Sequence, residues 1–466
     1  MATSRPFRVA VIGSGPAGFY ATTQLLASAD PEFEVDLYDR LPTPFGLVRA
    51  GVAPDHPKIK AVTKAFDKTA THERFRFAGG VELGTDVSRE DLRAHYHAVI
   101  YAVGSATDRR LGIPGEDLDG SHAATEFVAW YNGHPDYSGL EFDLLNAKRV
   151  AVVGNGNVAI DVARMIALAE GELTTTDTAD HAIEVLRAAR VEEVVILGRR
   201  GPGQAAFTNP ELREMGELER ADVVVDPADI ELDPESQAWL ESEQAHRTNR
   251  INVEILREYA AREPEGKPTR VRFDFLVSPV EVLEGARGRM RGLKLERNEI
   301  VDGRAKGTGE YTELECQLVF RSIGYSGVPL AGIPFDERRG LIRNEGGRVV
   351  DQNSDVCPGE YATGWIKRGP SGVIGTNKKD SLDTVSKLIE DAKAGRLPEP
   401  ASDDIDALIA QTPHAVDWQG WEAIDRLERE AGEPQGRPRV KLVEWDELRR
   451  SSSSGTSCAA PPTAAR

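Results

Sequence analysis

Cysteine is scarce in this chain of 466 residues. Its three cysteines, Cys316, Cys357 and Cys458, lie far apart, and none belongs to a C-x-x-C pair. This scarcity argues against a disulfide framework, a redox-active disulfide and an iron–sulfur cluster bound by this chain. We therefore predict a protein of the reducing cytoplasm, and we predict no bound metal.

Long hydrophobic runs and excess positive charge are also absent. No apolar stretch is long enough to span a bilayer, and a strand-like segment starts at Arg8, so we expect no signal peptide. The 57 lysines and arginines are outnumbered by 76 aspartates and glutamates, which gives a net charge of −19. That balance argues against nucleic acid and anionic membranes as partners. The length allows two or three domains with cores of their own.

Glycine, in contrast, is abundant, and two glycine-rich turns are of the same kind, G-S-G-P-A-G at 13–18 and G-N-G-N-V-A at 154–159. Each turn follows an apolar run typical of a buried strand and precedes a helix-like stretch. The first glycine permits a tight bend, the second lets the backbone approach a pyrophosphate, and the third position must be small. Phosphates can then bind the free N–H groups of the helix N-terminus. The two turns predict two dinucleotide sites, with Gly13, Gly15, Gly18 and Gly156 among the residues that bind the cofactors.

The charged residues that follow each turn differ. Asp39 ends the strand-like segment 34–39, where a carboxylate can accept both ribose hydroxyls and would repel a 2′-phosphate. Arg199 and Arg200 end the segment 194–200, and guanidinium forks match a phosphate bidentately. The second site is therefore predicted to prefer NADP to NAD; the alternative is a pair of ordinary solvated arginines. The spacing from the second turn to this pair is about twice the usual value of roughly 20 residues, and we expect residues 170–190 to lengthen the crossover.

Four sequence blocks together resemble adrenodoxin-reductase-type ferredoxin–NADP⁺ reductases. They are L-P-T-P-F-G-L-V-R-A-G-V-A-P-D-H-P at 41–57, the turn at 154–159, G-R-R-G-P at 198–202, and G-W-I-K-R-G-P-S-G-V-I-G-T-N at 364–377. The blocks follow the family order from about residue 8 to 395. The resemblance implies FAD in one domain, NADPH in the other, and electrons passed to a small iron–sulfur protein.

The order of the segments along the chain predicts the domain organisation, with the Gly/Pro-rich segment 104–115 as a crossover between domains. The fold class is α/β, with two Rossmann-like dinucleotide-binding domains and the NADP domain inserted in the FAD domain. We predict the first part of the FAD domain at 1–108, the NADP domain at 109–325, the second part of the FAD domain at 326–450, and a disordered tail at 451–466. Residues 223–267, which are polar and acidic, are predicted to be a helical insertion.

Roles of individual residues follow from the resemblance, position by position. Around FAD it implies Ala17 near the pyrophosphate, Asp39 on the ribose, Leu47 and Val81 beside the cofactor, and Trp365, Gly372, Val373 and Ile374 by the isoalloxazine. On the NADP side it implies Asn155, Gly156, Asn157, Val158, Arg199, Arg200 and Glu211, with Gly372 near the nicotinamide and Arg109 as a further candidate beside Arg110. Asp39 stands where glutamate is usual in this family.

Two residues are candidates for a catalytic role. The resemblance places His56 on the nicotinamide side of the flavin, with Glu214 as its partner. Proton handling or nicotinamide positioning is one interpretation, because histidine titrates near neutrality. A structural histidine inside the proline-rich turn 54–57 is the other, and the residues favour neither.

For the acceptor we predict a ferredoxin or a similar small acidic electron carrier, reduced by a monomeric enzyme. Lys60, Lys64 and Lys68 are spaced to lie on one helix face and could bind such a carrier, extended by Lys367 and Arg368 or by Arg247 and Arg250. An ordinary solvated helix face is the alternative. Rival functions are an electron-input subunit of a larger complex, a flavin monooxygenase or disulfide reductase, and an NADP-sensing protein without flavin chemistry.

Overall fold

The computed structural model describes residues 5–453, which divide into two compact units. Unit 1 takes the described residues up to Val52, His56–Thr107 and those from Tyr325 on, and unit 2 takes Ala53–Asp55 and Asp108–Gly324. The chain passes between them at β5 (Thr107–Asp108) and β15 (Tyr325–Ser326), which pair as a two-stranded sheet. No helix within residues 5–453 has the length and apolar character needed to cross a membrane.

Unit 1 is built on a seven-stranded sheet in the order β18-β19-β20-β4-β1-β2-β3. The neighbours from β20 to β3 are parallel, while β18, β19 and β20 pair antiparallel. The strands are β1 (Phe7–Ile12), β2 (Phe33–Asp39), β3 (Phe75–Gly79), β4 (Ala98–Tyr101), β18 (Asn344–Glu345), β19 (Arg348–Val350) and β20 (Val356–Ala362), with β16 (Phe335–Asp336) and β17 (Leu341–Ile342) as a separate pair. The carboxyl ends of parallel strands meet at one edge of such a sheet, and ligands bind there in open α/β folds.

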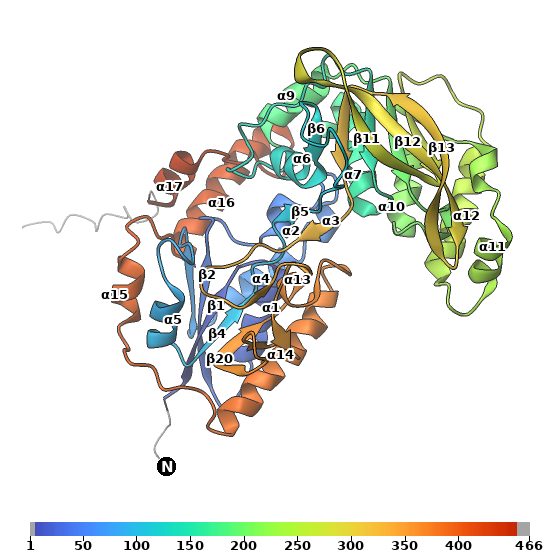
Figure 1. Ribbon diagram of the computed structural model, residues 1–466. Coiled ribbons are helices and arrows are strands. Elements are labelled where there is room, and N and C mark those ends of the chain that lie inside the picture. The colour runs from blue at the N-terminus through green and yellow to red at the C-terminus, as the bar shows by residue number, and fades with distance from the viewer. Residues whose placement is uncertain (1–4, 454–466) are drawn as a thin grey trace, which may run out of the picture. The chain divides into compact units, whose positions relative to one another are not determined.

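Helices from both ends of the sequence pack in unit 1. The long helix α14, which comes after the chain has returned to unit 1, contacts α1, and Figure 1 shows the two side by side. The helices are α1 (Pro16–Leu26), α2 (Leu47–Ala50), α3 (Pro57–Lys60), α4 (Thr63–Ala70), α5 (Arg89–His95), α13 (Trp365–Arg368), α14 (Thr376–Lys393), α15 (Ile405–Ala410), α16 (Trp418–Gly432) and α17 (Trp445–Ser453).

A buried ion-pair network ties α16 to the block at 41–57. Glu428 is fully buried and accepts hydrogen bonds from Arg49 at 2.9 Å, from Arg439 at 2.9 Å and from the Leu442 N–H at 2.9 Å. Burial would raise the pKa of Glu428, but Arg49 and Arg439 lower it below its ordinary value. Removing one partner of such a network leaves a buried charge uncompensated. The C-terminal segment through residue 442 is therefore part of the fold of unit 1.

Unit 2 holds a six-stranded parallel sheet in the order β6-β14-β7-β8-β10-β9. A second sheet, β11-β12-β13, is antiparallel. The strands are β6 (Ser121–Ala123), β7 (Arg149–Val153), β8 (Glu193–Gly198), β9 (Ala221–Val225), β10 (Thr269–Phe275), β11 (Val277–Glu284), β12 (Met290–Val301), β13 (Arg304–Glu315) and β14 (Leu318–Arg321). β7 and β8 are buried almost throughout, as their unbroken apolar runs predict for central parallel strands.

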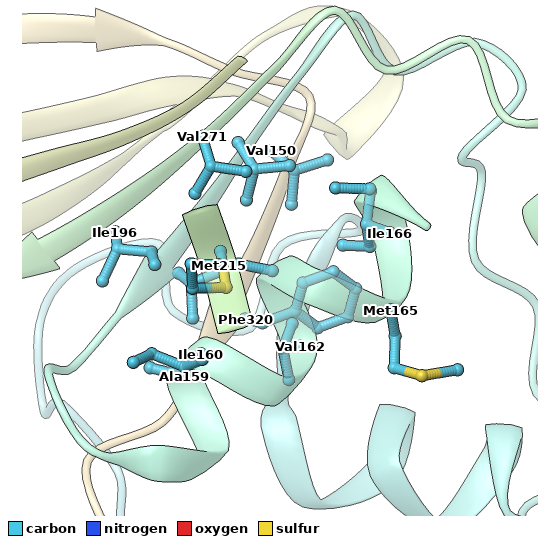
Figure 2. Close-up of a cluster of buried hydrophobic side chains, with 14 of the residues drawn as sticks. Val150, Ala159, Ile160, Val162, Met165, Ile166, Ile196, Met215, Val271 and Phe320 are labelled. Atoms are coloured by element: carbon cyan, nitrogen blue, oxygen red, sulfur yellow. The ribbon is translucent and has the colours of Figure 1, made fainter. Parts of the chain in front are cut away.

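The core of unit 2 forms between this sheet and α7. The helices are α6 (Ala124–Tyr131), α7 (Asn157–Ala167), α8 (Glu170–Leu173), α9 (Asp180–Ala188), α10 (Asn209–Glu214), α11 (Pro234–Glu241) and α12 (Arg247–Ala260). Figure 2 shows the packing of Val150, Ile196, Val271 and Phe320 from the strands with Ile160, Val162, Met165 and Ile166 from α7. Burying each large apolar side chain contributes about 1.5–3 kcal/mol, so this layer fixes α7 and the turn that precedes it.

The predicted α/β fold class with two Rossmann-like domains is confirmed. Residues 223–267 are largely helical as predicted, and α8 and α9 lengthen the crossover between α7 and β8. The disordered tail is wrong for residues 451–453, which end α17; residues 454–466 lie outside the described part.

The lysine row is also wrong as a single helix face. Lys60 ends α3 and Lys64 lies in α4, with Ala61 and Val62 between the two helices. Of the second basic pair, Arg250 donates hydrogen bonds to the carbonyl oxygens of Leu240 and Ser242. Both Arg247 and Arg250 are exposed, so their place in a docking patch stays a prediction.

Candidate functional site

The first glycine turn lies at the carboxyl end of β1, where the chain enters α1. Gly13 has a φ of +104°, and a Cβ there would lie 2.6 Å from the Ala102 carbonyl oxygen. A Cβ on Gly18 would lie 1.9 Å from the Gly13 carbonyl oxygen, whereas a Cβ on Gly15 would meet only the Cα of Gly46, at 4.0 Å. The fold itself requires Gly13 and Gly18. Gly15 instead leaves open space at the N-terminus of α1, as close approach of a pyrophosphate requires.

Asp39, the last residue of β2, holds this turn. Its carboxylate accepts hydrogen bonds from the Ser14 N–H at 2.8 Å, from the Ser14 hydroxyl, and from the Leu41 N–H at 2.9 Å. Burial raises the pKa of Asp39, and these hydrogen bonds oppose that rise. A carboxylate offers about four lone-pair sites, so acceptor capacity remains for a ligand hydroxyl. The buried Val81 donates its N–H to the Asp39 carbonyl oxygen at 2.9 Å, which holds Val81 beside the carboxyl end of β2.

The block at 41–57 closes on the first turn from another side. Phe45, with a φ of +85°, donates its N–H to the Ser14 carbonyl oxygen at 3.0 Å. A Cβ on Gly46 would lie only 3.0 Å from the Cα of Gly15. Leu47 follows directly and begins α2. The structure therefore brings Leu47 to the turn that contains Gly15.

Trp365 approaches the same turn from the C-terminal part of unit 1. Gly364 has a φ of +75°, and a Cβ there would lie 2.6 Å from the Cβ of Ala17. The indole Nε1 of Trp365 is buried and has no hydrogen-bond partner within residues 5–453. A buried donor without a partner costs about 1–3 kcal/mol. A ligand acceptor is what this N–H lacks, so Trp365 fits a bound cofactor better than an ordinary core position.

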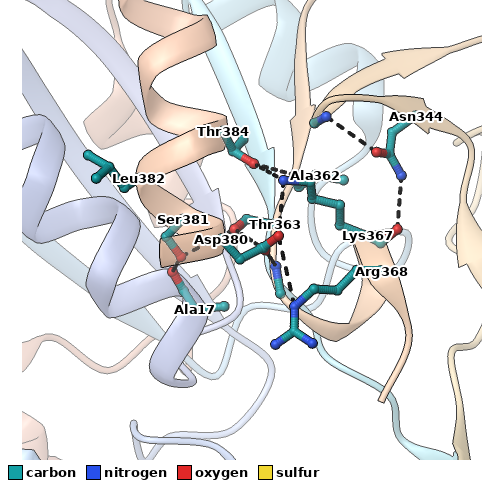
Figure 3. A network of polar contacts seen from close by, with 12 residues as sticks. Ala17, Asn344, Ala362, Thr363, Lys367, Arg368, Asp380, Ser381, Leu382 and Thr384 are labelled. Atoms are coloured by element: carbon teal, nitrogen blue, oxygen red, sulfur yellow. Dashed lines mark hydrogen bonds and ion pairs between the residues drawn. The ribbon is translucent and has the colours of Figure 1, made fainter. Parts of the chain in front are cut away.

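A polar network on α14 holds the Gly364 segment (Figure 3). The Asp380 carboxylate accepts the Gly364 N–H at 2.6 Å and pairs with the Lys367 ammonium at 3.0 Å. Ser381 donates its hydroxyl hydrogen to the Ala17 carbonyl oxygen at 3.0 Å. The Lys367 side chain is 12% exposed, so its predicted place in a docking patch is wrong.

The loop before α14 carries the remaining residues predicted for the flavin. Gly372 has a φ of +79°, and the Val373 N–H donates to the Thr376 hydroxyl at 3.2 Å. Val373 is 62% exposed, while Ile374 packs partly against the core of unit 1. An exposed apolar side chain beside a glycine, at a helix N-terminus, is a surface that a flat ring can cover.

In the second glycine turn, as in the first, one glycine is required by the fold and another leaves open space for a ligand. Gly154 has a φ of +136°, and a Cβ there would lie 2.2 Å from the Ser322 carbonyl oxygen. Gly156 precedes α7, and a Cβ there would meet nothing within 4 Å. Ala159 is fully buried. The first position is again required by the fold, and the second again leaves space at a helix N-terminus.

The asparagines of this turn contact the loop before α10. The Asn157 Oδ1 accepts the Thr208 N–H at 2.8 Å, and the Asn155 carbonyl oxygen accepts the Ala206 N–H at 2.8 Å. The Asn155 Nδ2 is buried without a hydrogen-bond partner in the described chain. Val158 packs partly against the core. Asn155 thus offers a donor that a bound nucleotide could engage.

Arg199 and Arg200 follow the end of β8. Arg199 is exposed and Arg200 half-buried, and neither guanidinium has an ion-pair partner between residues 5 and 453. Burial and the charge of Arg199 lower the pKa of Arg200. Two adjacent cations without carboxylate partners, in so acidic a chain, are a donor set suited to a phosphate dianion.

Arg109 and Arg110 differ in whether their side chains have ion-pair partners. Arg110 pairs with Asp117 and, at 3.6 Å, with Glu116. Arg109 is exposed, its N–H donates to the Gly324 carbonyl oxygen at 3.0 Å, and its side chain has no ion pair in the described part of unit 2. Of the two, Arg109 is the one available to a ligand.

Glu211 and Glu214 surround a buried arginine on α7. Arg164 is 2% exposed, and its guanidinium lies 2.7 Å from Asp55, 2.8 Å from Asp161, 3.3 Å from Glu211 and 3.7 Å from Glu214. Burial alone would lower the pKa of Arg164, but the carboxylates raise it above its ordinary value. Arg164 therefore fixes the predicted site residues Glu211 and Glu214 within unit 2.

His56 belongs to unit 1 and lies directly before α3. Its backbone φ is −109°, and its carbonyl oxygen accepts the Ile59 N–H at 3.1 Å, which starts the helix. Its two interpretations, proton handling and a structural role in the turn, are both compatible with this position.

Sequence reasoning missed Arg164 and Asp380. Arg164 carries a usable signal, since it is a lone cation inside the apolar run at 158–169. Asp380 carries none, because it follows two lysines in a helix that looks solvated. Only the three-dimensional contacts reveal that Asp380 holds the Trp365 segment.

Comparison with known proteins places these features in context. Residues 7–197 match the family model described as pyridine nucleotide-disulphide oxidoreductase. NADPH-ferredoxin reductase FprA of Mycobacterium tuberculosis is 50% identical, with 96% of this chain and 99% of that protein covered. Mitochondrial NADPH:adrenodoxin oxidoreductase of Arabidopsis thaliana is 41% identical, with 96% and 95% covered. A solved structure of M. tuberculosis FprA in complex with NADPH superposes with a TM-score of 0.90 at 47% identity, covering 96% of this chain and 100% of that chain.

Proposed function

The chain belongs to the family of NADPH–ferredoxin reductases, and we propose on this basis that it transfers a hydride from NADPH to FAD and then single electrons to a ferredoxin-type iron–sulfur protein. The observation that carries the proposal is the contrast between the two glycine turns. The first is held by a carboxylate, Asp39, and the second is followed by two guanidinium groups without ion-pair partners in the described chain. Two nucleotides of different charge are thereby accommodated in one molecule.

For FAD we propose the site around the first turn in unit 1. Gly13, Gly15, Ala17 and Gly18 surround the pyrophosphate, Asp39 accepts from the ribose, and Leu47, Val81, Trp365 and the 372–374 backbone line the ring system. The open Cβ position at Gly15 and the unpaired indole N–H of Trp365 support this fit. When bound, FAD supplies the capacity to accept two electrons as a hydride and to release them one at a time.

For NADPH we propose the site around the second turn in unit 2. The N-terminus of α7, with Asn155, Gly156, Asn157 and Val158, faces the pyrophosphate, and Arg199 and Arg200 bind the 2′-phosphate. Arg109 and Glu211 are additional contacts. The free space at Gly156 and the unpaired amide of Asn155 support this fit.

We propose that His56 and Glu214 position the nicotinamide or hold a proton near it. Hydride transfer itself needs no protein acid or base. The buried Arg164 lies 3.7 Å from the Glu214 carboxylate and pairs with it, which supports a positioning role for this carboxylate.

We propose that the FAD domain comprises residues 1–108 and 326–450 and the NADP domain residues 109–325. We further propose that the electron acceptor is a small acidic carrier and that the protein is a cytoplasmic monomer. The location is supported by Cys316 and Cys357, which are both unpaired thiols. The net charge of −19 supports a partner other than nucleic acid.

Replacing both arginines tests the NADP assignment. Each charge-assisted hydrogen bond to the 2′-phosphate contributes roughly 1.5–3 kcal/mol, so Arg199→Ala/Arg200→Ala should lower kcat/KM for NADPH on the order of a hundredfold. The value for NADH should change little. Arg187→Ala/Arg190→Ala removes the same charge from exposed positions of unit 2 and should leave both values unchanged. Equal losses for NADPH and NADH in the first variant would show that the pair is structural.

A further inference from the structure

We propose that Asn298 is a positioning residue for NADP specificity, because it fixes the backbone of the Arg199–Arg200 pair. The proposal rests on the proposed function, in which this pair binds the 2′-phosphate. Asn298 comes from β12, in the antiparallel sheet, about a hundred residues after the pair it holds. Nothing in its sequence surroundings marks it as a nucleotide-site residue.

The contact is direct and buried. Asn298 is 5% exposed, and its side-chain Nδ2 donates one hydrogen bond to the Arg199 carbonyl oxygen at 2.9 Å and another to the Ser278 hydroxyl at 2.8 Å. Its backbone N–H donates to the Leu276 carbonyl oxygen at 2.7 Å. Both amide hydrogens of the side chain are therefore used, and one of them holds the backbone of the arginine pair.

The carbonyl of Arg200 is held from the same region. The Leu276 N–H donates to the Arg200 carbonyl oxygen at 3.4 Å. Leu276 has a φ of +55°, a conformation that is costly for a branched side chain and that persists only where surrounding contacts impose it. The register of β12 against β13 shifts between Glu296 and Asn298, and such bulges re-aim a side chain. The strained backbone of Leu276 and the bulge before Asn298 thus each place a donor at a carbonyl oxygen of the arginine pair.

Anchoring the backbone matters here because the side chains lack anchors. The two guanidinium groups have no ion-pair partners in the described chain, and as adjacent like charges they repel each other. Without Asn298, the turn after β8 would keep its charges but lose one of the bonds that hold them in a fixed place. A fixed pair binds a phosphate without the ordering cost that a mobile pair incurs. Asn298 should therefore affect the recognition of the 2′-phosphate and leave the rest of the nucleotide unaffected.

The test measures binding of 2′,5′-ADP and of 5′-AMP to the FAD-loaded protein by isothermal titration calorimetry. Asn298→Ala should raise the Kd of 2′,5′-ADP about five- to tenfold, the equivalent of one or two neutral hydrogen bonds, with the Kd of 5′-AMP unchanged. Asn298→Asp keeps the shape of the side chain and loses its N–H donors, so it should also weaken 2′,5′-ADP binding selectively. Ser278→Ala leaves the bond to Arg199 in place and should retain the wild-type preference.

Three outcomes would overturn the proposal. If Asn298→Ala and Asn298→Asp keep the preference while Arg199→Ala/Arg200→Ala loses it, Asn298 is not a positioning residue and the proposed function stands. If both Asn298 variants weaken the two ligands equally, the residue is merely structural. If the wild-type protein shows no preference for 2′,5′-ADP, the proposed NADP site fails together with this proposal.

Discussion

The role of a charged residue in this protein depends on the partners that it has. Arg164 is surrounded by four carboxylates and is committed to the interior of unit 2. Arg199 and Arg200 lack such partners in the described chain and keep their donors for a ligand. A charge without a partner in a folded protein raises the question of what binds it.

Asp274 is a residue whose charge the fold satisfies only in part. It lies on β10, its side chain is 23% exposed, and Arg272 pairs with it at 3.0 Å. Burial raises the pKa of Asp274 to about 6, because Arg272 offsets only part of the desolvation and Asp229 adds to the rise. The carboxyl therefore favours the folded state when protonated, and this contribution is lost as the pH rises through about 6.

We predict that Asp274→Asn is more stable than the wild type at pH 8, by about 1–3 kcal/mol for a pKa shift of this size. The difference should close as the pH falls from 6 towards 4. Thermal unfolding across this pH range measures the difference. Parallel pH profiles of Asp274→Asn and the wild type would refute the assignment.

Asp391 gives a prediction of the opposite sign. Burial would raise its pKa, but Arg348 and Tyr361 lower the pKa to about 2, so Asp391→Asn should be destabilised at pH 7.

At the scale of elements, each dinucleotide site is a strand, a glycine turn and a helix. The two turns separate a glycine that the fold needs from one that a ligand needs. Gly154 has no room for a Cβ, whereas Gly156 has open space. A pair of single substitutions can therefore distinguish folding from binding at neighbouring positions.

Gly156→Ala should fold with nearly wild-type thermal stability, because its φ of −113° suits alanine, but should bind NADPH at least about tenfold more weakly because the methyl group occupies the space of the pyrophosphate. Gly154→Ala should lose roughly 1–3 kcal/mol of stability through backbone strain and the clash with Ser322. Thermal unfolding and equilibrium titration with NADPH measure the two effects. Wild-type affinity in Gly156→Ala would contradict the site.

Elements with strong local patterns could be predicted from the sequence. The apolar runs and glycine turns gave β1, β2, β7 and β8 with the helices α1 and α7 that follow them. The helical break at Ala61–Val62 was missed, since no glycine or proline marks it. The strands β12 and β13 were missed because β13 is almost wholly exposed and polar, so its stability comes from pairing rather than from a buried face.

Candidate site residues could be predicted from the sequence only where a charged residue stands at a fixed place relative to a glycine turn. Asp39 and the arginine pair stand at strand ends, where the glycine turns mark the nucleotide. Asn298 and Asp380 act through contacts between segments distant in sequence. A single sequence contains no record of such contacts.

At the scale of the whole molecule, the chain forms one unit, leaves it at residue 107, builds a second unit, and returns at residue 325. Each unit contains its own parallel sheet and its own glycine turn. The C-terminal segment through residue 442 completes unit 1, since Glu428 of α16 joins it to Arg49 of the block at 41–57. In the proposed reaction, both sites work together.

Anaerobic stopped-flow spectroscopy of the purified, FAD-loaded protein tests that reaction most directly. Mixing with NADPH should bleach the flavin absorption, with NADH far less effective, and a ferredoxin added next should restore the colour as two ferredoxins are reduced for each NADPH oxidised. A protein that shows no flavin spectrum even after FAD is added, or a flavin that NADPH reduces but that no ferredoxin or similar carrier reoxidises, would contradict the account.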